Sequence, residues 1–250
     1  MASQSVDVKK LLEAGAHFGH KTSRWHPKMA PYIHSKRGGI HIIDLYKTVE
    51  GIENATEFLT KVAKEGKQVL FVGTKRQSKE IIKQVAEDTN MPYVCERWLG
   101  GMLTNQKTMS ARIKHLRDLE IKMDSGALAS KYNKLELQKY QEEIDQMNFL
   151  YGGIKEMSIR PGAVFVADMI NDANAIREAK KLDIPIVAVT DTNADPSLVD
   201  YPIPCNDDAV KSIQQIVDYV KNAILEGKKQ QKTVTKPVQE TKVVGVNNGY

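Results

Sequence analysis

The stretch RWLGGMLTNQKT, residues 97–108, divides the chain into two kinds of structure. Before it, short β-branched runs alternate with helical patterns, and after it come about forty residues with helical apolar spacing. Gly100 and Gly101 allow backbone conformations that other residues avoid, and Thr104 or Asn105 is a candidate N-cap for the helix that follows. Trp98 either pins this turn to the core or lies on the surface as a contact residue.

On both sides of this junction the sequence predicts a parallel sheet. Apolar runs typical of strands buried on both faces stand at residues 68–72, 91–95, 163–167, 184–189 and 201–204. Helical patterns occupy residues 48–64, 77–88, 173–181 and 207–225, with Thr48 as the expected N-cap of the first and Gly66 as its end. Alternation with crossovers of this length indicates an α/β fold with a doubly wound parallel sheet.

Two apolar stripes with steps of three and four residues follow the junction. They comprise Met109, Ile113, Leu116, Leu119 and Met123, and then Leu137, Tyr140, Ile144, Met147 and Tyr151. Residues 124–130, DSGALAS, are the expected turn between two helices of about 20 residues, which would project roughly 30 Å. We therefore expect an inserted antiparallel coiled-coil arm over residues 105–153, within a sheet domain made of residues 48–104 and 154–226.

The strongest local signal for a nucleic-acid surface lies between residues 17 and 47. This segment has a single acidic residue, Asp44, and the six basic residues Lys21, Arg24, Lys28, Lys36, Arg37 and Lys47. Trp25 and Tyr32 interleave with the charges, and Pro27 and Pro31 are expected to keep the backbone extended until a short strand at residues 39–45. Cations suit phosphates, and aromatic faces suit unstacked bases.

The remaining composition argues against several other classes of protein. The histidines His17, His20, His26, His34 and His41 match no zinc-binding spacing, and no nearby Cys or Glu completes a set, so we predict no metal. Cys95 and Cys205 form no CxxC pair, which fits a reducing compartment. With no signal peptide and no apolar run near the length of a membrane span, we expect a cytoplasmic protein. A net charge of +5 and a pI near 9.0 permit a polyanionic partner.

An enzyme is the alternative that the residues leave open. FVGTKRQS, residues 71–78, follows a strand and opens a helix as a phosphate-binding loop does, but it has only Gly73 and no GxGxxG or GxxxxGK[ST] pattern. DTNADP, residues 191–196, places Asp191 and Asp195 where α/β enzymes keep catalytic groups, although such turns are also common structural loops. The alternative is a mononucleotide-binding enzyme that uses residues 73–77 and the Asp191 loop. No complete catalytic set is visible.

Eight motifs, in order along the chain, resemble the bacterial small-subunit ribosomal protein S-two family. They are HFGH (17–20), WHPKMAPYI (25–33), GGIHIIDL (38–45), FVGTKRQ (71–77), RWLGGMLTN (97–105), GGIKEM (152–157), DTNADP (191–196) and IPCNDDA (203–209). The resemblance covers residues 5–226, and Cys205 stands where the family usually has glycine. If that position needs a positive φ, Cys205 would strain the turn.

The resemblance implies a flavodoxin-like domain with a coiled-coil insertion, in a structural component of the small (30S) ribosomal subunit that supports translation. Such a protein would bind 16S rRNA between head and body, help recruit ribosomal protein S-one, contact neighbouring small-subunit proteins, and have no catalytic activity, cofactor, small-molecule substrate or membrane contact. Residues 1–47 would be a basic rRNA-contacting segment that begins with a short helix, and residues 227–250 a disordered tail. The expected rRNA contacts are Lys21, Arg24, Trp25, His26, Lys28, Lys36, Arg37, Lys75, Arg76, Arg97, Thr104, Asn105, Lys107, Thr108, Arg112 and Lys114.

Overall fold

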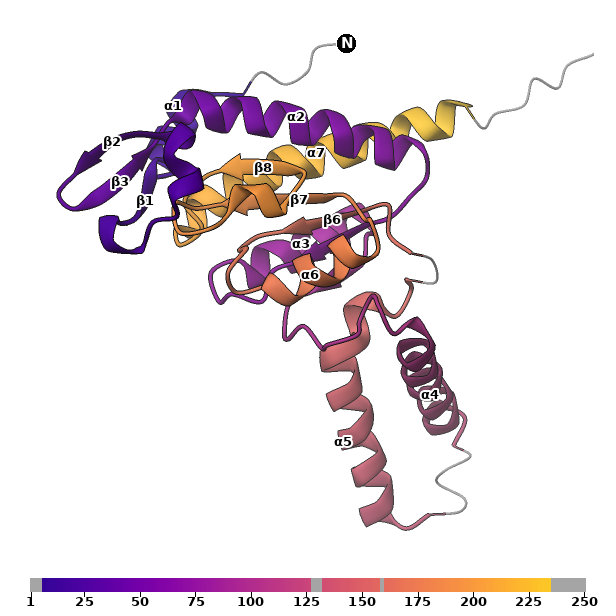
Figure 1. Cartoon of the computed structure of the whole chain (residues 1–250). Helices are drawn as coiled ribbons and strands as arrows, with labels where there is room; N and C mark the ends of the chain where they lie inside the picture. Colours follow the sequence, from indigo (N-terminus) through magenta and orange to yellow (C-terminus); the bar gives the residue numbers. More distant parts are fainter. Residues whose placement is uncertain (1–5, 127–131, 158–159, 235–250) are drawn as a thin grey trace, which may run out of the picture.

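The computed structural model describes residues 6–126, 132–157 and 160–234. A short helix, α1 (Val8–Glu13), and a small three-stranded sheet come first, followed by an α/β body (Figure 1). Two helices, α4 (Gln106–Asp124) and α5 (Lys134–Tyr151), interrupt the body and extend away from it (Figure 1). No helix in these described ranges is long and apolar enough to cross a membrane.

The body is built on a five-stranded sheet whose neighbouring strands are all parallel. In spatial order it contains β5 (Tyr93–Val94), β4 (Val69–Val72), β6 (Ala163–Val166), β7 (Ile186–Thr190) and β8 (Tyr201–Pro204). The chain starts at β4, moves outward to β5, and then crosses to the other side of β4 to build the remaining strands. This order confirms the predicted flavodoxin-like sheet and places its topological switch point between β4 and β6.

Helices cover both faces of the sheet, as a doubly wound fold requires. They are α2 (Leu45–Lys64), α3 (Lys79–Thr89) and α7 (Val210–Val234) on one face, and α6 (Ala173–Lys181) on the other. Along β4, Val69 and Phe71 face the first group, whereas Leu70 and Val72 face α6 and Trp98. Since successive strand residues point to opposite faces, a continuous apolar run is what a sheet covered on both sides needs.

Helix α2 begins earlier than the sequence predicts. Its N-cap is Asp44, whose side chain accepts a hydrogen bond from the backbone N–H of Tyr46 at 2.9 Å. Thr48, the predicted cap, lies inside the helix, where it is buried and donates its hydroxyl to the carbonyl oxygen of Pro204 at 2.6 Å. A threonine hydroxyl that reaches a neighbouring strand looks the same in sequence as a capping hydroxyl. Gly66, with a φ of 75°, follows the end of the helix as predicted.

The basic N-terminal segment is more ordered than predicted. Instead of an extended irregular chain, it forms an antiparallel sheet of β1 (Phe18–Lys21), β3 (Ile40–Ile43) and β2 (Ile33–Arg37). Pro27 begins a 3₁₀ helix, because its fixed φ suits the first position of a helical turn as well as an extended chain. Gly38 and Gly39, with φ of 58° and 78°, supply the tight turn between β2 and β3. We call these three strands and the residues between them the small sheet.

The two helices between β5 and β6 occupy the predicted arm. Four buried side chains join them: Leu116, Leu119, Ile144 and Met147. Met109 and Ile113, predicted for the same stripe, instead pack against the core of the body, so the contact between the helices is shorter than the pattern indicates. Most of the predicted turn at residues 124–130 lies outside the described residues, and coiled-coil packing along the full arm stays a prediction.

The predicted tail is wrong in its first eight residues, because α7 continues to Val234. Gly227 looks like a helix end in sequence, but a Cβ there would lie 2.5 Å from the carbonyl oxygen of Thr60 in α2. Glycine at this position therefore allows α7 and α2 to approach closely. The rest of the predicted tail, residues 235–250, lies outside the described residues.

Cys205 fits its turn without strain. The described non-glycine residues with positive φ are Asn90 and Asp183, and Cys205 is not among them. Its backbone N–H donates to the carbonyl oxygen of Thr190, and its buried Sγ lies 2.9 Å from the hydroxyl of Ser212. Burial raises the pKa of the thiol to about 12, so this cysteine behaves as a small core residue.

Candidate functional site

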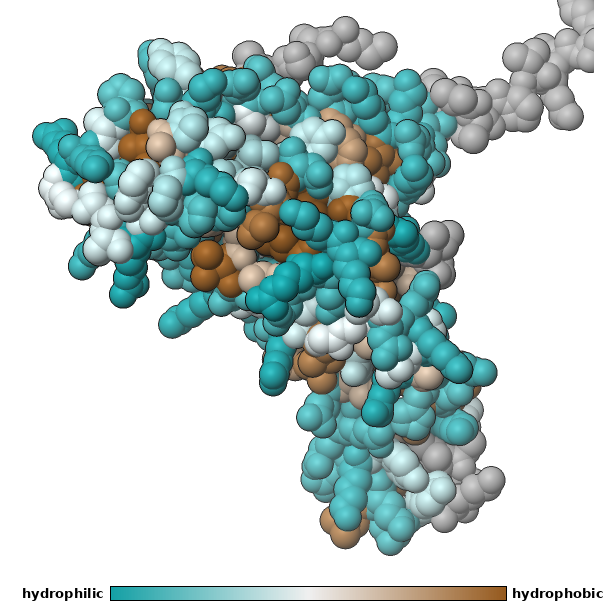
Figure 2. All heavy atoms as spheres, in the orientation of Figure 1, coloured by the Kyte–Doolittle hydropathy of each residue, from teal (hydrophilic) through white to brown (hydrophobic). Residues whose placement is uncertain are grey.

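The small sheet presents cations to solvent. All residues of β2 after Ile33 are exposed, including Lys36 and Arg37, and Lys21 and Arg24 are exposed beside them. Within the described part of the chain, no carboxylate forms an ion pair with Lys21, Arg24 or Arg37. On the face shown in Figure 2, hydrophilic and intermediate residues cover most of the small sheet and the arm, while hydrophobic ones gather on the body between them. The sheet therefore offers unneutralised positive charge on a rigid support.

Trp25 lies among these cations. The Nζ atom of Lys36 is 5.7 Å from the centre of its ring, and the ring of the buried His41 is 5.0 Å away. A half-buried indole held by a histidine ring and a lysine cation is a preorganised surface for stacking an unpaired base.

The DTNADP loop holds the small sheet against the body. Thr192 accepts the backbone N–H of His20 on its Oγ1 at 2.8 Å and the backbone N–H of His26 on its carbonyl oxygen at 2.7 Å. A Cβ on Gly19 would lie 2.5 Å from Cγ2 of Thr192, so only glycine allows this approach. The DTNADP loop thus has a structural role. It joins β1 to the end of β7, although these strands are distant in sequence.

Two of the predicted RNA contacts face this same loop. Lys28 donates to Asp195 at 2.8 Å and to Ser197 at 2.7 Å, and its hydrogen bond holds the pKa of the Asp195 carboxyl well below its usual range. Nδ1 of His26 accepts the backbone N–H of Lys28 at 3.3 Å. Lys28 therefore carries less free charge toward a phosphate than its exposed neighbours do.

A single carboxylate organises the loop at the base of the arm. Glu178 of α6 accepts the indole N–H of Trp98 at 3.0 Å and the backbone N–H groups of Gly101, Leu103 and Thr104 at 2.7, 3.0 and 3.1 Å. Burial tends to raise the pKa of Glu178, but these hydrogen bonds outweigh it and lower the pKa. Trp98 is only 7% exposed, which settles its role as the residue that pins the turn.

The remaining predicted contacts at this base divide into two groups. Thr104 donates its hydroxyl to Glu178, and Asn105 caps α4 by accepting the backbone N–H of Thr108 at 3.3 Å, so the polar groups of Thr104 and Asn105 serve the loop. The exposed cations form the second group: Arg97, Lys107, Arg112 and Lys114, together with Arg76, which is exposed in the loop between β4 and α3. Within the described ranges, none of the second group forms an ion pair with a carboxylate.

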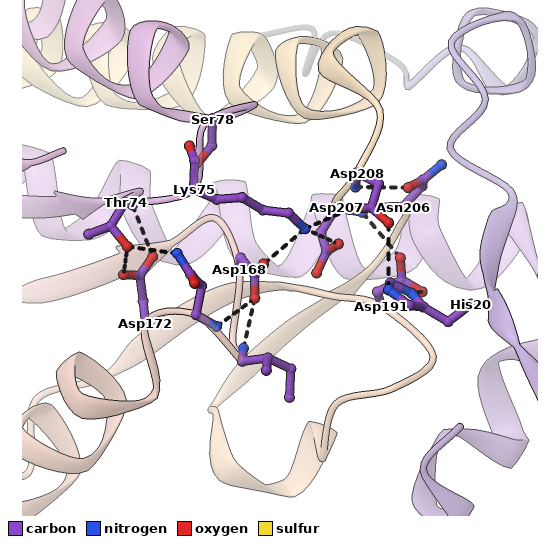
Figure 3. Close-up of polar contacts among 12 residues, drawn as sticks. His20, Thr74, Lys75, Ser78, Asp168, Asp172, Asp191, Asn206, Asp207 and Asp208 are labelled. Carbon is purple, nitrogen blue, oxygen red and sulfur yellow. Dashed lines mark hydrogen bonds and ion pairs between the residues drawn. The ribbon is translucent and has the colours of Figure 1, made fainter. Parts of the chain in front are cut away.

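Lys75 corrects the sequence prediction. Its Nζ lies 2.9 Å from Asp168, 2.7 Å from Asp207 and 2.9 Å from Asp208, at the C-terminal edge of the large sheet (Figure 3). Burial lowers the pKa of Lys75, but hydrogen bonds with these carboxylates outweigh it and raise the pKa. Because its charge is directed inward and neutralised, we remove Lys75 from the expected RNA contacts.

His20 and Asp191 extend this polar cluster toward the small sheet. Nδ1 of His20 lies 3.1 Å from Oδ1 of Asp191, and this hydrogen bond raises the pKa of His20 despite burial (Figure 3). Burial, followed by repulsion from Asp168 and Asp191, raises the pKa of Asp207 to about 7. Asp168, Asp207 and Glu178 were not among the residues predicted from the sequence to organise a site. For Asp168, the available signal was an acidic residue directly after the buried apolar run at residues 163–167.

The switch point itself is unsuited to a nucleotide phosphate. The hydroxyl of Thr74, after β4, donates to Asp172 at 2.7 Å across the crevice, and Lys75 reaches Asp168 beside it (Figure 3). Burial raises the pKa of Asp172 to about 6, against the hydrogen bonds from Thr74. The loop N–H of Thr74 and the ammonium of Lys75, which could receive a phosphate, are thus directed at carboxylates, and carboxylates repel a phosphate.

Comparison with known proteins now decides the family. The model of the family described as Ribosomal protein S2 matches residues 11–227. The chain belongs to the ribosomal protein S2 family. Ribosomal protein S2 is a structural, non-enzymatic component of the ribosome, so the mononucleotide-dependent enzyme that the residues left open is wrong.

Relatives in the ribosomal protein S2 family are similar over most of their length. The protein of Coprothermobacter proteolyticus, named small ribosomal subunit protein uS2, is 51% identical over 223 residues, which cover 89% of this chain and 83% of the relative. The uS2 protein of Chloroflexus aggregans is 49% identical over 222 residues, covering 89% and 93%. That of a Roseiflexus species is 47% identical over 233 residues, covering 93% and 88%.

Proposed function

We propose that this chain is a structural component of the small ribosomal subunit that binds 16S rRNA between the head and the body. The printed names of its relatives support the subunit. The observation that carries the RNA contact is the small sheet, where Lys21, Arg24 and Arg37 have no described carboxylate partner and where Lys36 lies over the ring of Trp25.

The base of the arm is the second part of the proposed interface. Its exposed cations, Arg97, Lys107, Arg112 and Lys114, stand beside a loop that Glu178 holds in place. Phosphate contacts release counterions, so affinity should fall linearly with salt on a logarithmic scale, with a slope of about −0.7 to −0.9 per contact. A slope of several units is expected if both parts bind.

Reconstitution of small subunits tests this proposal. Subunits depleted of this chain are mixed with purified protein at several salt concentrations, and the bound fraction is measured by sedimentation through sucrose. Replacing Lys21, Lys36 and Arg37 together with glutamine should weaken binding and reduce the salt slope by about two to three units. Lys61→Gln with Lys64→Gln, two exposed lysines near the end of α2, is the control for a general loss of surface charge and should leave the slope unchanged.

Two results would refute the RNA interface. One is a salt slope near zero for the natural chain, because that binding would not depend on phosphates. The other is an equal loss in the α2 control, which would mean that total charge matters and that the small sheet does not.

We further infer that the bound chain helps recruit ribosomal protein S-one and contacts neighbouring small-subunit proteins. Family resemblance supports this step, and the arm offers exposed apolar side chains for protein contacts, including Ile121, Leu135 and Phe149. Subunits rebuilt with and without this chain should differ in the amount of S-one that they retain after sedimentation. Equal retention would exclude a role in recruitment and leave RNA binding untouched.

A further inference from the structure

A cavity of about 240 Å³ lies where the arm leaves the body. It is bounded by α4, the residues that follow α5, and the end of α6, which Figure 1 shows on the side of the body from which the arm extends. Much of its lining consists of buried and half-buried apolar side chains: Met102, Met109, Ile113, Ile154, Met157 and Leu182. Since an apolar cavity of about 150 Å³ accepts a benzene ring, this arm-base cavity has room for one larger ring.

The walls of the arm-base cavity are held in place before any ligand binds. Glu178 accepts the backbone N–H groups of Leu103 at 3.0 Å and of Thr104 at 3.1 Å, and both of these residues line the cavity. Met109 and Ile154 belong to the apolar core of the body. A cavity whose walls are already ordered loses little conformational entropy when it is filled.

Polar side chains also line the arm-base cavity. Gln106 and Ser110 are exposed and lie one helical turn apart on α4, and Arg160 is exposed in the chain that leads to β6. Within the described ranges, the side chains of these three residues have no hydrogen-bond or ion-pair partner. An amide and a hydroxyl each donate and accept, which suits the mixed edge of a nucleobase, and a guanidinium suits a phosphate.

We propose that the arm-base cavity binds one unstacked base of 16S rRNA. The base occupies the apolar space, its edge faces Gln106 and Ser110, and its phosphate faces Arg160. Proteins hold an extruded base in this way, between apolar side chains and with hydrogen bonds along its edge. The inference rests on the proposed function, and it adds a specific ligand to the base of the arm.

The charges around the arm-base cavity favour RNA over a protein side chain as its occupant. Lys107 and Lys114 follow Gln106 and Ile113 on α4, and neither lysine pairs with a described carboxylate. The described residues that line the cavity include Arg160 and no carboxylate. A polyanion that carries flat rings therefore complements both the apolar space and the positive charge beside it.

Filling the cavity tests this inference in the reconstitution assay. Ile113→Trp places a ring in the space that the base would occupy, and it should weaken binding of the full chain to depleted subunits by about tenfold, the usual worth of one stacked base. Because the change alters no charge, the salt slope should stay the same. Ile121→Trp, the same change at an exposed position two turns further along α4, is the matched control.

A second variant keeps the cavity open and removes the contacts along the edge of the base. Gln106→Ala with Ser110→Ala changes two exposed side chains that have no described partner, so the variant should fold, which circular dichroism checks. Binding should weaken by about threefold or more, again with an unchanged slope. Gln138→Ala with Gln141→Ala, two exposed amides on α5, is the control and should bind as the natural chain does.

A photo-crosslinker identifies the occupant. Ser110→Cys can be labelled selectively with an aryl azide, because the natural Cys95 and Cys205 are buried. In assembled subunits, irradiation should join this residue to a nucleotide of the rRNA. Crosslinks to protein alone would overturn the inference.

The assay separates this inference from the proposed function. A salt slope near zero for the natural chain would refute both. A steep slope with folded Ile113→Trp and Gln106→Ala/Ser110→Ala variants that bind as tightly as the natural chain would refute the bound base alone. An equal loss in Ile121→Trp would also refute it, because the cavity would then not be the cause.

Discussion

The small sheet and the arm both carry basic residues away from the same body, but they attach to it differently. The small sheet is attached mainly through polar contacts with one loop, in which Thr192 accepts two backbone N–H groups and Lys28 pairs with Asp195. The arm grows out of the apolar core, where Trp98 and Met109 are buried, and Glu178 accepts the indole N–H of Trp98 and three backbone N–H groups of its first loop. The attachment of the arm should therefore depend on the Glu178 carboxylate. The attachment of the small sheet should depend on the close approach of Gly19 to Thr192.

The largest effect is expected from Glu178→Ala. The change leaves the indole N–H of Trp98 and several backbone N–H groups of the loop without an acceptor. Each unsatisfied donor costs about 1–3 kcal/mol, with partial relief from water, so unfolding free energy should fall by about 3–4 kcal/mol in urea titrations. Glu57→Ala, at an exposed pair with Lys61 on α2, is the control and should leave the unfolding free energy nearly unchanged, because exposed ion pairs contribute little. Equal effects would mean that the loop does not depend on Glu178.

Gly19→Ala should have the next largest effect, on the small sheet. The added Cβ meets the side chain of Thr192 and the carbonyl oxygen of His41 at 3.2 Å, and such overpacking costs about 1–3 kcal/mol. Adding Thr192→Ala removes the nearest atoms, so the double variant should recover about 1 kcal/mol relative to the sum of the single changes. If the losses of unfolding free energy of the two single variants simply add in the double variant, β1 does not need the close approach of Gly19 to Thr192. Gly100→Ala, where a Cβ meets nothing within 4 Å, is the control.

Acid should weaken the attachment of the arm. Because the folded-state pKa of Glu178 is lowered, its contribution to stability is fully present above the ordinary glutamate pKa, near 4.5, and is lost as the pH falls through the folded value. The difference in unfolding free energy between the natural chain and Glu178→Gln should therefore be constant from pH 7 to 5 and shrink below pH 4.5. A difference that grows with falling pH would contradict this assignment.

The smallest effect concerns the platform on the small sheet. Lys36→Met removes the cation above Trp25 and should cost only about 0.5 kcal/mol of stability, the usual size at an exposed site. It should nevertheless shift the fluorescence of Trp25, whereas Lys21→Met, which removes a neighbouring exposed charge, should not. Identical spectra for both variants would mean that Lys36 does not contact the ring in solution.

Sequence patterns predicted the parts of this molecule that follow from local periodicity. The run Val69 to Val72 is apolar at every position, and only a strand covered on both faces makes such a run favourable in water. The same reasoning located α4 and α5. It also gave Thr104 and Asn105 as the two candidate caps of α4, and Asn105 is the one that caps the helix. It also indicated the exposed cations of the small sheet, because charge in a folded chain is generally left at the surface.

Local patterns were insufficient where a residue has its partner far along the chain. Thr48 resembles a cap but bonds to Pro204, Lys75 resembles a phosphate ligand but pairs with Asp207, and Gly227 resembles a helix end but packs on Thr60. In each case the residue type allows two roles of similar energy, and the neighbour supplied by folding selects one.

By itself, then, the sequence determined the strands of the large sheet, most of the helices, the doubly wound class and the family, because these depend on the hydropathy and motifs of contiguous residues. Only the tertiary structure decided that Glu178 holds the arm, that Thr192 holds the small sheet, and that His20 meets Asp191 and Asp207. The physical reason is that parallel strands bring their C-terminal ends to one edge, so residues separated by more than a hundred positions share one site, and no spacing in the sequence records that meeting.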